Sequence, residues 1–338
     1  MWFRSRLRRW LALTGCATML AALASSFAST PSQADPVVKP FTLVMIPDTQ
    51  LAVQNKPELF YAQTEWILQE RKRANIRFVV HVGDVVEWPS RISDWERAKM
   101  AMQPLDRKVP YQLAVGNHDF DAWACEPPAT CNPWEHIEED RSTTYFNTYF
   151  PLSLFEEWPT FGGNYPREQS DNTYFEFRAG GIDWLVITVA FNPTDAELAW
   201  AERVIAKHRN QLVIVNTHEY QDGDVRTPTG DRIWNVLKKY PNVRFVFSGH
   251  YVNQGMRVDL GDHGNPVYQI QADYQTYSIP DVNENGYLRV MKVDPAARTM
   301  SVQTYSPYCD KTGECPAYKT DARNQFTITD LDLRTWRR

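Results

Sequence analysis

The chain has 338 residues, of which 43% are hydrophobic and 23% are charged. These fractions are typical of soluble globular proteins and exclude a collagen-like, low-complexity or disordered chain. Five cysteines are too few for a small disulfide-held scaffold of this length. The formal net charge is −5, and the part of the chain after residue 34 is more acidic still, because the first 34 residues contain arginines and no acid. We therefore expect no nucleic-acid partner.

Residues 1–34 have the pattern of a signal peptide. Four arginines precede an apolar stretch from Trp10 to Ala24, which is too short to span a bilayer as a helix. Cleavage is expected after Ala34, with Ala28 as a second candidate. The sequence thus predicts an exported protein, periplasmic or extracellular, with no membrane association after cleavage. The alternatives are an uncleaved anchor, twin-arginine export or lipidation at Cys16.

The four cysteines outside this segment form two close pairs in sequence, Cys125 with Cys131 and Cys309 with Cys315. An even number of cysteines in an oxidising compartment indicates two disulfides, for which three connectivities exist. Local pairing is the simplest of them. A cysteine metal site is the alternative, although the spacing is longer than the Cys-x-x-Cys of zinc sites.

Short apolar runs alternate with amphipathic stretches along the chain, which predicts an α/β core. Strands are expected at residues 41–46, 76–82, 111–115, 173–177, 183–190, 212–215, 243–247, 267–270, 287–293 and 300–305. Helices are expected at residues 57–73, 92–105, 195–208 and 231–240. Residues 120–172 are rich in aromatics, proline and glycine and are interpreted as an insertion above the core. Its aromatics are expected to pack among themselves, with a substrate groove as the alternative.

Polar residues that can bind metals follow five of the predicted strands. They are Asp48, Asp84, the run Asn117-His118-Asp119, His218 and His250. Each one alone is compatible with a turn or a helix cap. Ligands of open α/β sheets bind at the carboxyl ends of the strands, so we expect all five groups to converge. Their oxygen and imidazole donors suit Mn, Fe, Zn or Mg rather than thiolate-binding metals.

This series resembles the calcineurin-like metallophosphoesterase superfamily. Its motifs Asp-x-His, Gly-Asp-x-x-(Asp/Glu), Gly-Asn-His-(Asp/Glu), a lone His and Gly-His-x-His correspond to residues 48–50, 83–87, 116–119, 218 and 249–252. Residues 272–275, 285–289 and 304–307 resemble an exported microbial branch. The resemblance implies an α/β fold of two packed mixed β-sheets flanked by helices, the αββα sandwich. The phosphoesterase core would span residues 35–256, with the insertion at 120–172, and a β-rich segment, 257–338, would complete the same domain.

The resemblance also implies a centre of two divalent ions. Asp84 would bridge both ions, and the ligands that complete one of them would be Asn117, His218 and His250. Asp48 and Gln50 would bind the other ion. Glu87 is either a further ligand or a hydrogen-bond acceptor behind the ligands, and the two readings stay open. His118 would stabilise the transition state or protonate the leaving oxygen, and Asp119 would hold the ring of His118.

Two residues depart from the motifs. Gln50 stands where the family often has His, and Val252 replaces the last His of Gly-His-x-His. Both changes remove ligands from the same ion. We therefore expect one tightly bound ion and one weakly bound ion.

The predicted function is that of an exported metal-dependent phosphoesterase, which hydrolyses phosphate mono- or diesters by attack of a metal-bound hydroxide. The expected partner is a phosphate-ester substrate, and the sequence indicates no protein partner. The alternative is a metal- or ligand-binding protein that kept the fold and lost activity. Gln50 and Val252 favour this alternative, whereas His118 argues against it because binding alone does not require that residue.

Overall fold

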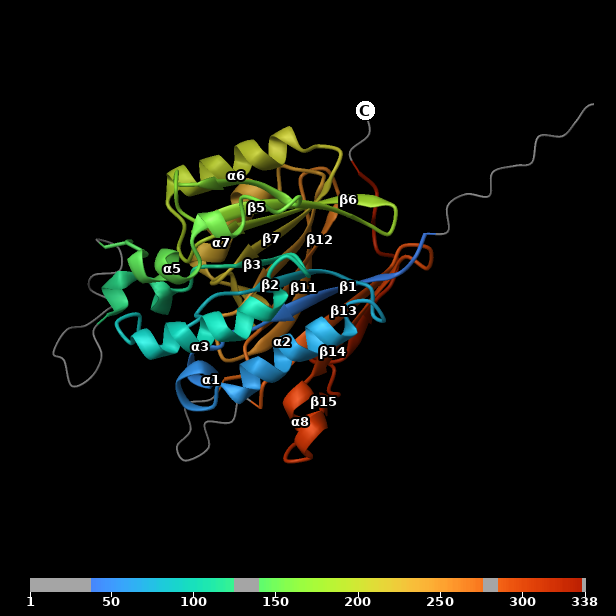
Figure 1. Cartoon of the computed structure of the whole chain (residues 1–338). Coiled ribbons are helices and arrows are strands. Elements are labelled where there is room, and N and C mark those ends of the chain that lie inside the picture. Colours follow the sequence, from blue (N-terminus) through green and yellow to red (C-terminus); the bar gives the residue numbers. More distant parts are fainter. Residues whose placement is uncertain (1–37, 125–139, 276–284, 336–338) are drawn as a thin grey trace, which may run out of the picture. The chain divides into compact units, whose positions relative to one another are not determined.

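The computed structural model describes residues 38–124, 140–275 and 285–335 (Figure 1). All of them belong to one compact unit, Val38–Arg338. The predicted signal peptide and the Cys125–Cys131 pair lie outside the described residues. Within those residues, none of the helices combines the length and hydropathy needed to span a bilayer.

The first of two mixed sheets has the strand order β15-β14-β13-β1-β2-β3, and β16 pairs with β14. Its strands are β1 (Phe41–Ile46), β2 (Ile76–His81), β3 (Tyr111–Leu113), β13 (Leu288–Asp294), β14 (Thr299–Tyr305), β15 (Tyr318–Lys319) and β16 (Phe326–Ile328). The central strand β1 runs parallel to β2 and antiparallel to β13. The C-terminal part of the chain therefore forms four of the seven strands of this sheet.

The second sheet has the order β11-β12-β10-β7-β6-β5-β4. Its strands are β4 (Phe161–Tyr165), β5 (Asn172–Ala179), β6 (Ile182–Val189), β7 (Leu212–Thr217), β10 (Val243–Ser248), β11 (Gln254–Leu260) and β12 (Pro266–Ala272). The four strands β6, β7, β10 and β12 are parallel. Two further short strands, β8 (Gln221–Asp222) and β9 (Val225–Arg226), pair only with each other.

Helices cover the outer faces of both sheets, α2 and α3 on the first and α6 and α7 on the second (Figure 1). The helices are α1 (Gln50–Asn55), α2 (Glu58–Glu70), α3 (Ile92–Met102), α5 (Thr144–Tyr149), α6 (Asp195–Lys207), α7 (Pro228–Leu237) and α8 (Pro307–Thr312). Helix α6 begins with a capping box. The Thr194 hydroxyl accepts from the Glu197 amide at 3.2 Å, and the Glu197 carboxylate accepts from the Thr194 amide at 2.6 Å.

Residues of the second sheet alternate between two apolar layers, as the two-residue period of a strand requires. In β6, Trp184 and Val186 join the layer between the sheets, whereas Leu185 and Ile187 join the layer beneath α6 and α7. The layer between the sheets includes an edge-to-face contact of Phe41 with Trp184, whose ring centroids are 5.7 Å apart. Both faces of this sheet are therefore buried, which explains the nearly continuous apolar runs of its parallel strands.

The expected fold, two packed mixed sheets flanked by helices, is confirmed. The expected pairing of Cys309 with Cys315 is also present as a disulfide. Helices α1 and α8 and the edge strand β11 were not predicted, although Met256, Val258 and Leu260 of β11 alternate with other residues. The predicted boundary between residues 256 and 257 falls inside β11.

The described part of the 120–172 stretch contains regular elements and packs through aromatic side chains. It contains α5 and β4. The rings of Phe155 and Trp158 pack on Tyr111 of β3, with centroids 5.7 and 5.0 Å away. These aromatics therefore join the core between the sheets, which is a wider role than packing within the insertion.

Candidate metal centre

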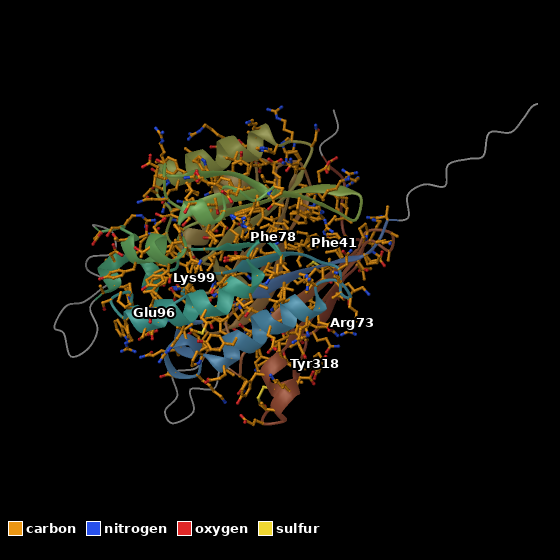
Figure 2. The ribbon with its side chains drawn as sticks, in the orientation of Figure 1. Phe41, Arg73, Phe78, Glu96, Lys99 and Tyr318 are labelled. Carbon is orange, nitrogen blue, oxygen red and sulfur yellow. A yellow bond between two sulfur atoms is a disulfide. The ribbon has the colours of Figure 1, made fainter. Side chains whose placement is uncertain are left out.

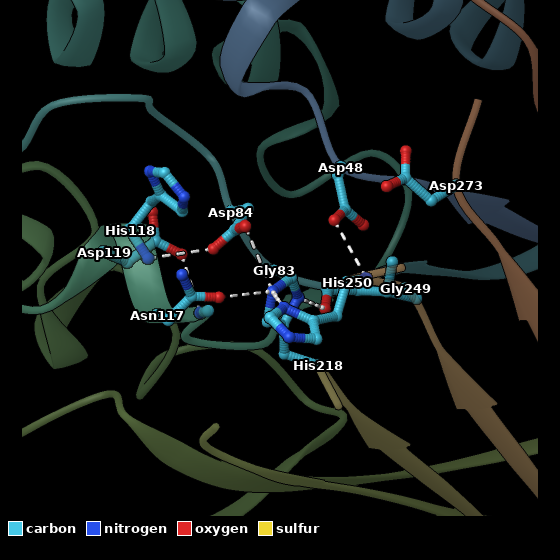
Figure 3. A network of polar contacts seen from close by, with 12 residues as sticks. Asp48, Gly83, Asp84, Asn117, His118, Asp119, His218, Gly249, His250 and Asp273 are labelled. Carbon is cyan, nitrogen blue, oxygen red and sulfur yellow. Dashed lines mark hydrogen bonds and ion pairs between the residues drawn. The ribbon is translucent and has the colours of Figure 1, made fainter. Parts of the chain in front are cut away.

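The carboxyl ends of strands from both sheets meet at one place, and each delivers a polar side chain there (Figure 3). Asp48 follows β1 and Asp84 follows β2 in the first sheet, while His218 follows β7 and His250 follows β10 in the second. Asn117 opens a short 3₁₀ turn, Asn117–Asp119, after β3. The structure thus brings together side chains that are up to about two hundred residues apart in sequence, as their places after strands predicted.

Four donor atoms converge around the ring of His218. Its Nε2 lies 3.1 Å from Oδ2 of Asp84, 3.1 Å from Oδ1 of Asn117 and 3.1 Å from Nδ1 of His250. The donor atoms of Asp84, His218 and His250 all lie within 4.8 Å of one another. Three of the four residues are buried, and His250 is partly buried.

This arrangement fits a cation. The Nδ1 of His218 lies 2.9 Å from the Val82 carbonyl, which can only accept, so Nδ1 carries the ring proton. In the neutral ring, Nε2 is then a lone-pair donor that faces an amide oxygen, a carboxylate and a second imidazole. A divalent ion would satisfy all four at once, and the oxygen and nitrogen donors suit Mn, Fe, Zn or Mg.

Asp84 favours a second proton on His218, at Nε2, and a bound cation would take the place of that proton. Burial alone would raise the pKa of Asp84, but His218 and His118 hold it well below its usual range. Burial would likewise lower the pKa of His218, but the Asp84 carboxylate raises it above the ordinary value. By contrast, burial and the charge of His218 lower the pKa of His250 to about 3. The His250 ring is therefore neutral and available as a ligand at neutral pH.

Glycines let the backbone approach these ligands. A Cβ on Gly116 would lie 2.1 Å from Oδ1 of Asp84, and one on Gly249 would lie 2.0 Å from Oδ1 of Asp48. Gly83 has φ +108°, a conformation that favours glycine, and its Cβ would lie 2.7 Å from Nδ1 of His218. The glycines of the three Gly-containing motifs are thus required by the close packing around the ligands.

Asp48 lies on the side of the centre assigned to the second ion. Its Oδ2 accepts a hydrogen bond from the His250 amide at 2.9 Å, while its Oδ1 is buried with no hydrogen-bond partner. Burial, followed by the charges of Asp273 and Asp84, raises the pKa of Asp48 well above its ordinary value. The side chain of Gln50 is buried and hydrogen-bonds the carboxylate of Glu87. The orphaned oxygen of Asp48 and its like-charged neighbours fit a second cation here.

His118 sits beside the ligands without joining them. Its backbone amide donates to Oδ1 of Asp84 at 3.0 Å, and its Nδ1 lies 2.9 Å from the carbonyl oxygen of Glu87. The Glu87 carboxylate lies 3.6 Å from the same Nδ1. Since a carbonyl only accepts, Nδ1 carries a proton and Nε2 is turned away from Glu87. The ring also packs against Trp123, with centroids 4.2 Å apart.

The role expected for Asp119 differs from what the structure shows. Its Oδ1 accepts from the Val85 amide at 2.9 Å, and its Oδ2 accepts from the Gly116 amide at 2.8 Å. Burial raises its pKa to about 7. The carboxylate therefore joins the loop after β2 to the loop after β3, and the carbonyl of Glu87 is what orients His118.

His81 supports the centre from behind. It is fully buried, and its Nδ1 accepts from the Gly83 amide at 3.2 Å, so its proton is on Nε2. Nε2 lies 3.0 Å from the hydroxyl of Thr49. Burial, reinforced by the charge of His218, lowers the pKa of His81 to about 3. The neutral ring thus connects the loops that carry Asp48 and Asp84.

Asp273 is a buried carboxylate of this region that was not predicted from the sequence as a site residue. It follows β12 and is fully buried, and Figure 3 shows it beside Asp48. Burial raises its pKa to about 7. The sequence feature that could have identified Asp273 is the one used for the other residues, because Asp273 follows closely after the predicted strand 267–270. It would have extended the series of strand ends from five to six.

Comparison with known proteins agrees with this geometry. Residues 41–254 match the family model of calcineurin-like phosphoesterases. The uncharacterized protein YvnB of Bacillus subtilis strain 168 is 33% identical over 308 residues, which cover 87% of this chain. The match spans only 22% of the length of that relative.

Two solved structures share the fold. The purple acid phosphatase PPD1 of yellow lupin has a TM-score of 0.54 and 14% identity, over 86% of this chain and 54% of that one. A dimetal phosphatase of Danio rerio has a TM-score of 0.51 and 15% identity, over 86% of this chain and 99% of that one. From the matched motifs and the shared fold, the chain belongs to the calcineurin-like phosphoesterase family.

Proposed function

We propose that this protein is an exported phosphoesterase that hydrolyses phosphate mono- or diesters at a centre of two divalent ions. The observation that carries the proposal is the convergence of Asp84, Asn117, His218 and His250 with His118 beside them. Asp84 would be shared by both ions, and Asp48 and Gln50 would contribute to the second. When bound, two such ions polarise the phosphoryl oxygens and lower the pKa of the attacking water.

The residues of the chain supply the remaining requirements. The protonated Nδ1 of His118 is engaged by Glu87, which leaves Nε2 as the nitrogen that can give a proton to the leaving oxygen when the bond to phosphorus breaks. Trp88 and Trp123 pack around the ring and limit its access to water.

Export is proposed from the N-terminal pattern of residues 1–34 and is supported by the Cys309–Cys315 disulfide, because disulfides persist in oxidising compartments. Cell fractionation and N-terminal sequencing of the protein from its host test this part. An N-terminus near residue 35 in the exported fraction supports it. A protein retained in the cytoplasm with an intact N-terminus contradicts it.

The activity is tested with purified protein that has been stripped with a chelator and reloaded with Mn, Zn, Fe or Mg. One chromogenic monoester and one diester are offered, and His118→Ala is the control. Turnover that depends on metal and is lost in the variant supports the proposal, and the preferred ester assigns the substrate class. Metal binding without turnover of any ester favours the alternative, a binding protein with the same fold.

A further inference from the structure

In the proposed reaction, the place of His118 determines where the leaving group of the substrate lies. The leaving oxygen takes its proton across a hydrogen bond, so it must come to about 3 Å from Nε2 of His118. The organic part of the leaving alcohol then lies against the side chains around the His118 ring. Two of these are Trp88 and Trp123, whose ring centroids are 6.4 and 4.2 Å from that of His118. The leaving-group side of the centre is therefore aromatic.

The two tryptophans differ in how much of the ring a ligand could still cover. Only 5% of Trp123 is exposed. Trp88 also packs against the apolar layer between the sheets, but it is only partly buried. Covering the exposed part of a large apolar ring is favourable, because it removes apolar surface from water. Trp88 is therefore the ring of this pair against which a leaving group would pack.

The loop that carries this ring is fixed on both sides of it. Before the ring, the carbonyl of Glu87 accepts from Nδ1 of His118 at 2.9 Å. After it, the carbonyl of Pro89 accepts from the indole N–H of Trp95 at 2.9 Å. Trp95 is fully buried and belongs to α3, the helix on which Figure 2 labels Glu96. The ring is thus held in place before a ligand arrives, which lowers the entropic cost of binding.

A rigid tryptophan face favours a planar partner. Stacking of one planar ring on an aromatic side chain strengthens binding by roughly fivefold to a hundredfold. An aliphatic group of the same size covers apolar surface but lacks the π-face that an offset stack requires. Such a contact lies away from the atoms whose charge changes during the reaction. It should therefore stabilise the bound substrate and the transition state equally, and lower KM without changing kcat.

We propose that Trp88 forms the subsite for the leaving group and selects phosphate esters whose leaving alcohol carries a planar aromatic ring close to the ester oxygen. The inference rests on the proposed function and narrows its substrate class. The metal centre would recognise the phosphoryl group, and Trp88 would recognise the alcohol. Because monoesters and diesters both release an alcohol beside His118, the role of Trp88 is the same for either.

The test compares benzyl and cyclohexylmethyl esters on the metal-loaded full chain, as monoesters or as methyl diesters according to which type the protein hydrolyses faster. The two alcohols have equally many carbons and similar basicity, so they differ chiefly in the planarity of the ring. In the unaltered protein, the KM of the benzyl ester should be the lower one. In Trp88→Leu it should rise at least about fivefold at unchanged kcat, while the KM of the cyclohexylmethyl ester changes less than about twofold. Trp88→Phe keeps a planar ring and should keep the preference.

Trp66→Leu is the matched control. Trp66 is also partly buried against the same apolar layer and contacts a ring, that of Tyr305 at 5.2 Å, but it lies on α2. This variant should leave KM and kcat of both esters unchanged. If Trp88→Leu lowers kcat of both esters at unchanged KM, or raises both KM values equally, the inference is overturned and the proposed function stays intact. If the unaltered protein hydrolyses no ester with any metal, the proposed function fails and the inference with it.

Discussion

Replacing His118 by Ala tests whether the residue that donates the proton is separate from the residues that bind the metal. The His118 side chain contacts the Glu87 carbonyl and Trp123 but supplies no donor atom to the cluster around His218. Metal content should therefore stay unchanged in His118→Ala. The free energy of unfolding should fall only by about 0.5–1.5 kcal/mol, the contribution of one hydrogen bond, plus the loss of ring packing.

The expected catalytic loss depends on the ester. A general acid contributes about 10²–10⁴-fold, which corresponds to about 3–5 kcal/mol in the activation barrier. That contribution matters for an alkyl ester, whose leaving alkoxide needs a proton. It matters little for a 4-nitrophenyl ester, whose leaving group is stable as an anion. We expect a loss of at least about 100-fold in kcat for the alkyl ester and less than about tenfold for the nitrophenyl ester.

The assay compares kcat for both esters in the unaltered protein, His118→Ala and His208→Ala. His208 is a matched control because its Nδ1 also bonds a backbone carbonyl, that of Val204 at 2.7 Å, and its side chain is 12% exposed against 10% for His118. The control should leave both rates unchanged. Equal losses for the two esters would refute the role as proton donor, and loss of metal in His118→Ala would refute the separation of His118 from the ligands.

Three further outcomes are expected. Gly249→Ala should weaken binding of the ion beside Asp48, because the new Cβ would lie 2.0 Å from Oδ1 of Asp48. The control Gly264→Ala should cost only about 1–2 kcal/mol of backbone strain, because its Cβ meets no atom within 4 Å. Calorimetry and thermal melts of both variants check this. Saturating metal at about 100 times its Kd should add about 2.7 kcal/mol to the free energy of unfolding, and a chelator should reverse the rise in Tm. The pKa of His81 is about 3 in the folded protein, below its value in the unfolded chain. The unfolded state therefore binds a proton that the folded state does not, and the free energy of unfolding should fall as pH drops from 6.5 toward 3. Denaturant titrations from pH 6.5 to 4 should show this component at about 1.4 kcal/mol per pH unit, and an equal slope in His81→Gln would contradict it.

The sequence predicted much of the centre because parallel strands can be recognised locally and their carboxyl ends lie at the same edge of a sheet. A buried run followed by Asp, Asn or His marks a strand end, and the carboxyl ends of such strands meet without any further information. This logic reached Asp84, Asn117, His218 and His250, whose donor atoms the structure brings together. It also applied to Asp273, which lies in the stretch 272–275 that resembles an exported microbial branch but was not predicted to be a site residue.

What the sequence could not supply is the direction of each side chain. Asp119 is adjacent to His118, yet its carboxylate binds the backbone of two loops, because the 3₁₀ turn at Asn117–Asp119 points the two side chains apart. The exposure of Val252 is likewise a property of the loop after β10 and not of its residue type. The short helices α1 and α8 were missed because short elements carry few periodic residues. Edge strand β11 was missed although its alternation of apolar and polar residues is visible in the sequence.

The place of β1 has a consequence for how the chain acquires its structure. This strand lies between β2 and β13, and its register with β13 joins Phe41 to Val293 across most of the chain. Until β13, Leu288–Asp294, has been synthesised, one edge of β1 has no partner. Such distant pairing makes folding slow, because a long loop must close before the contact forms. The loop carrying Asp48 should therefore be among the last parts of the centre to become fixed.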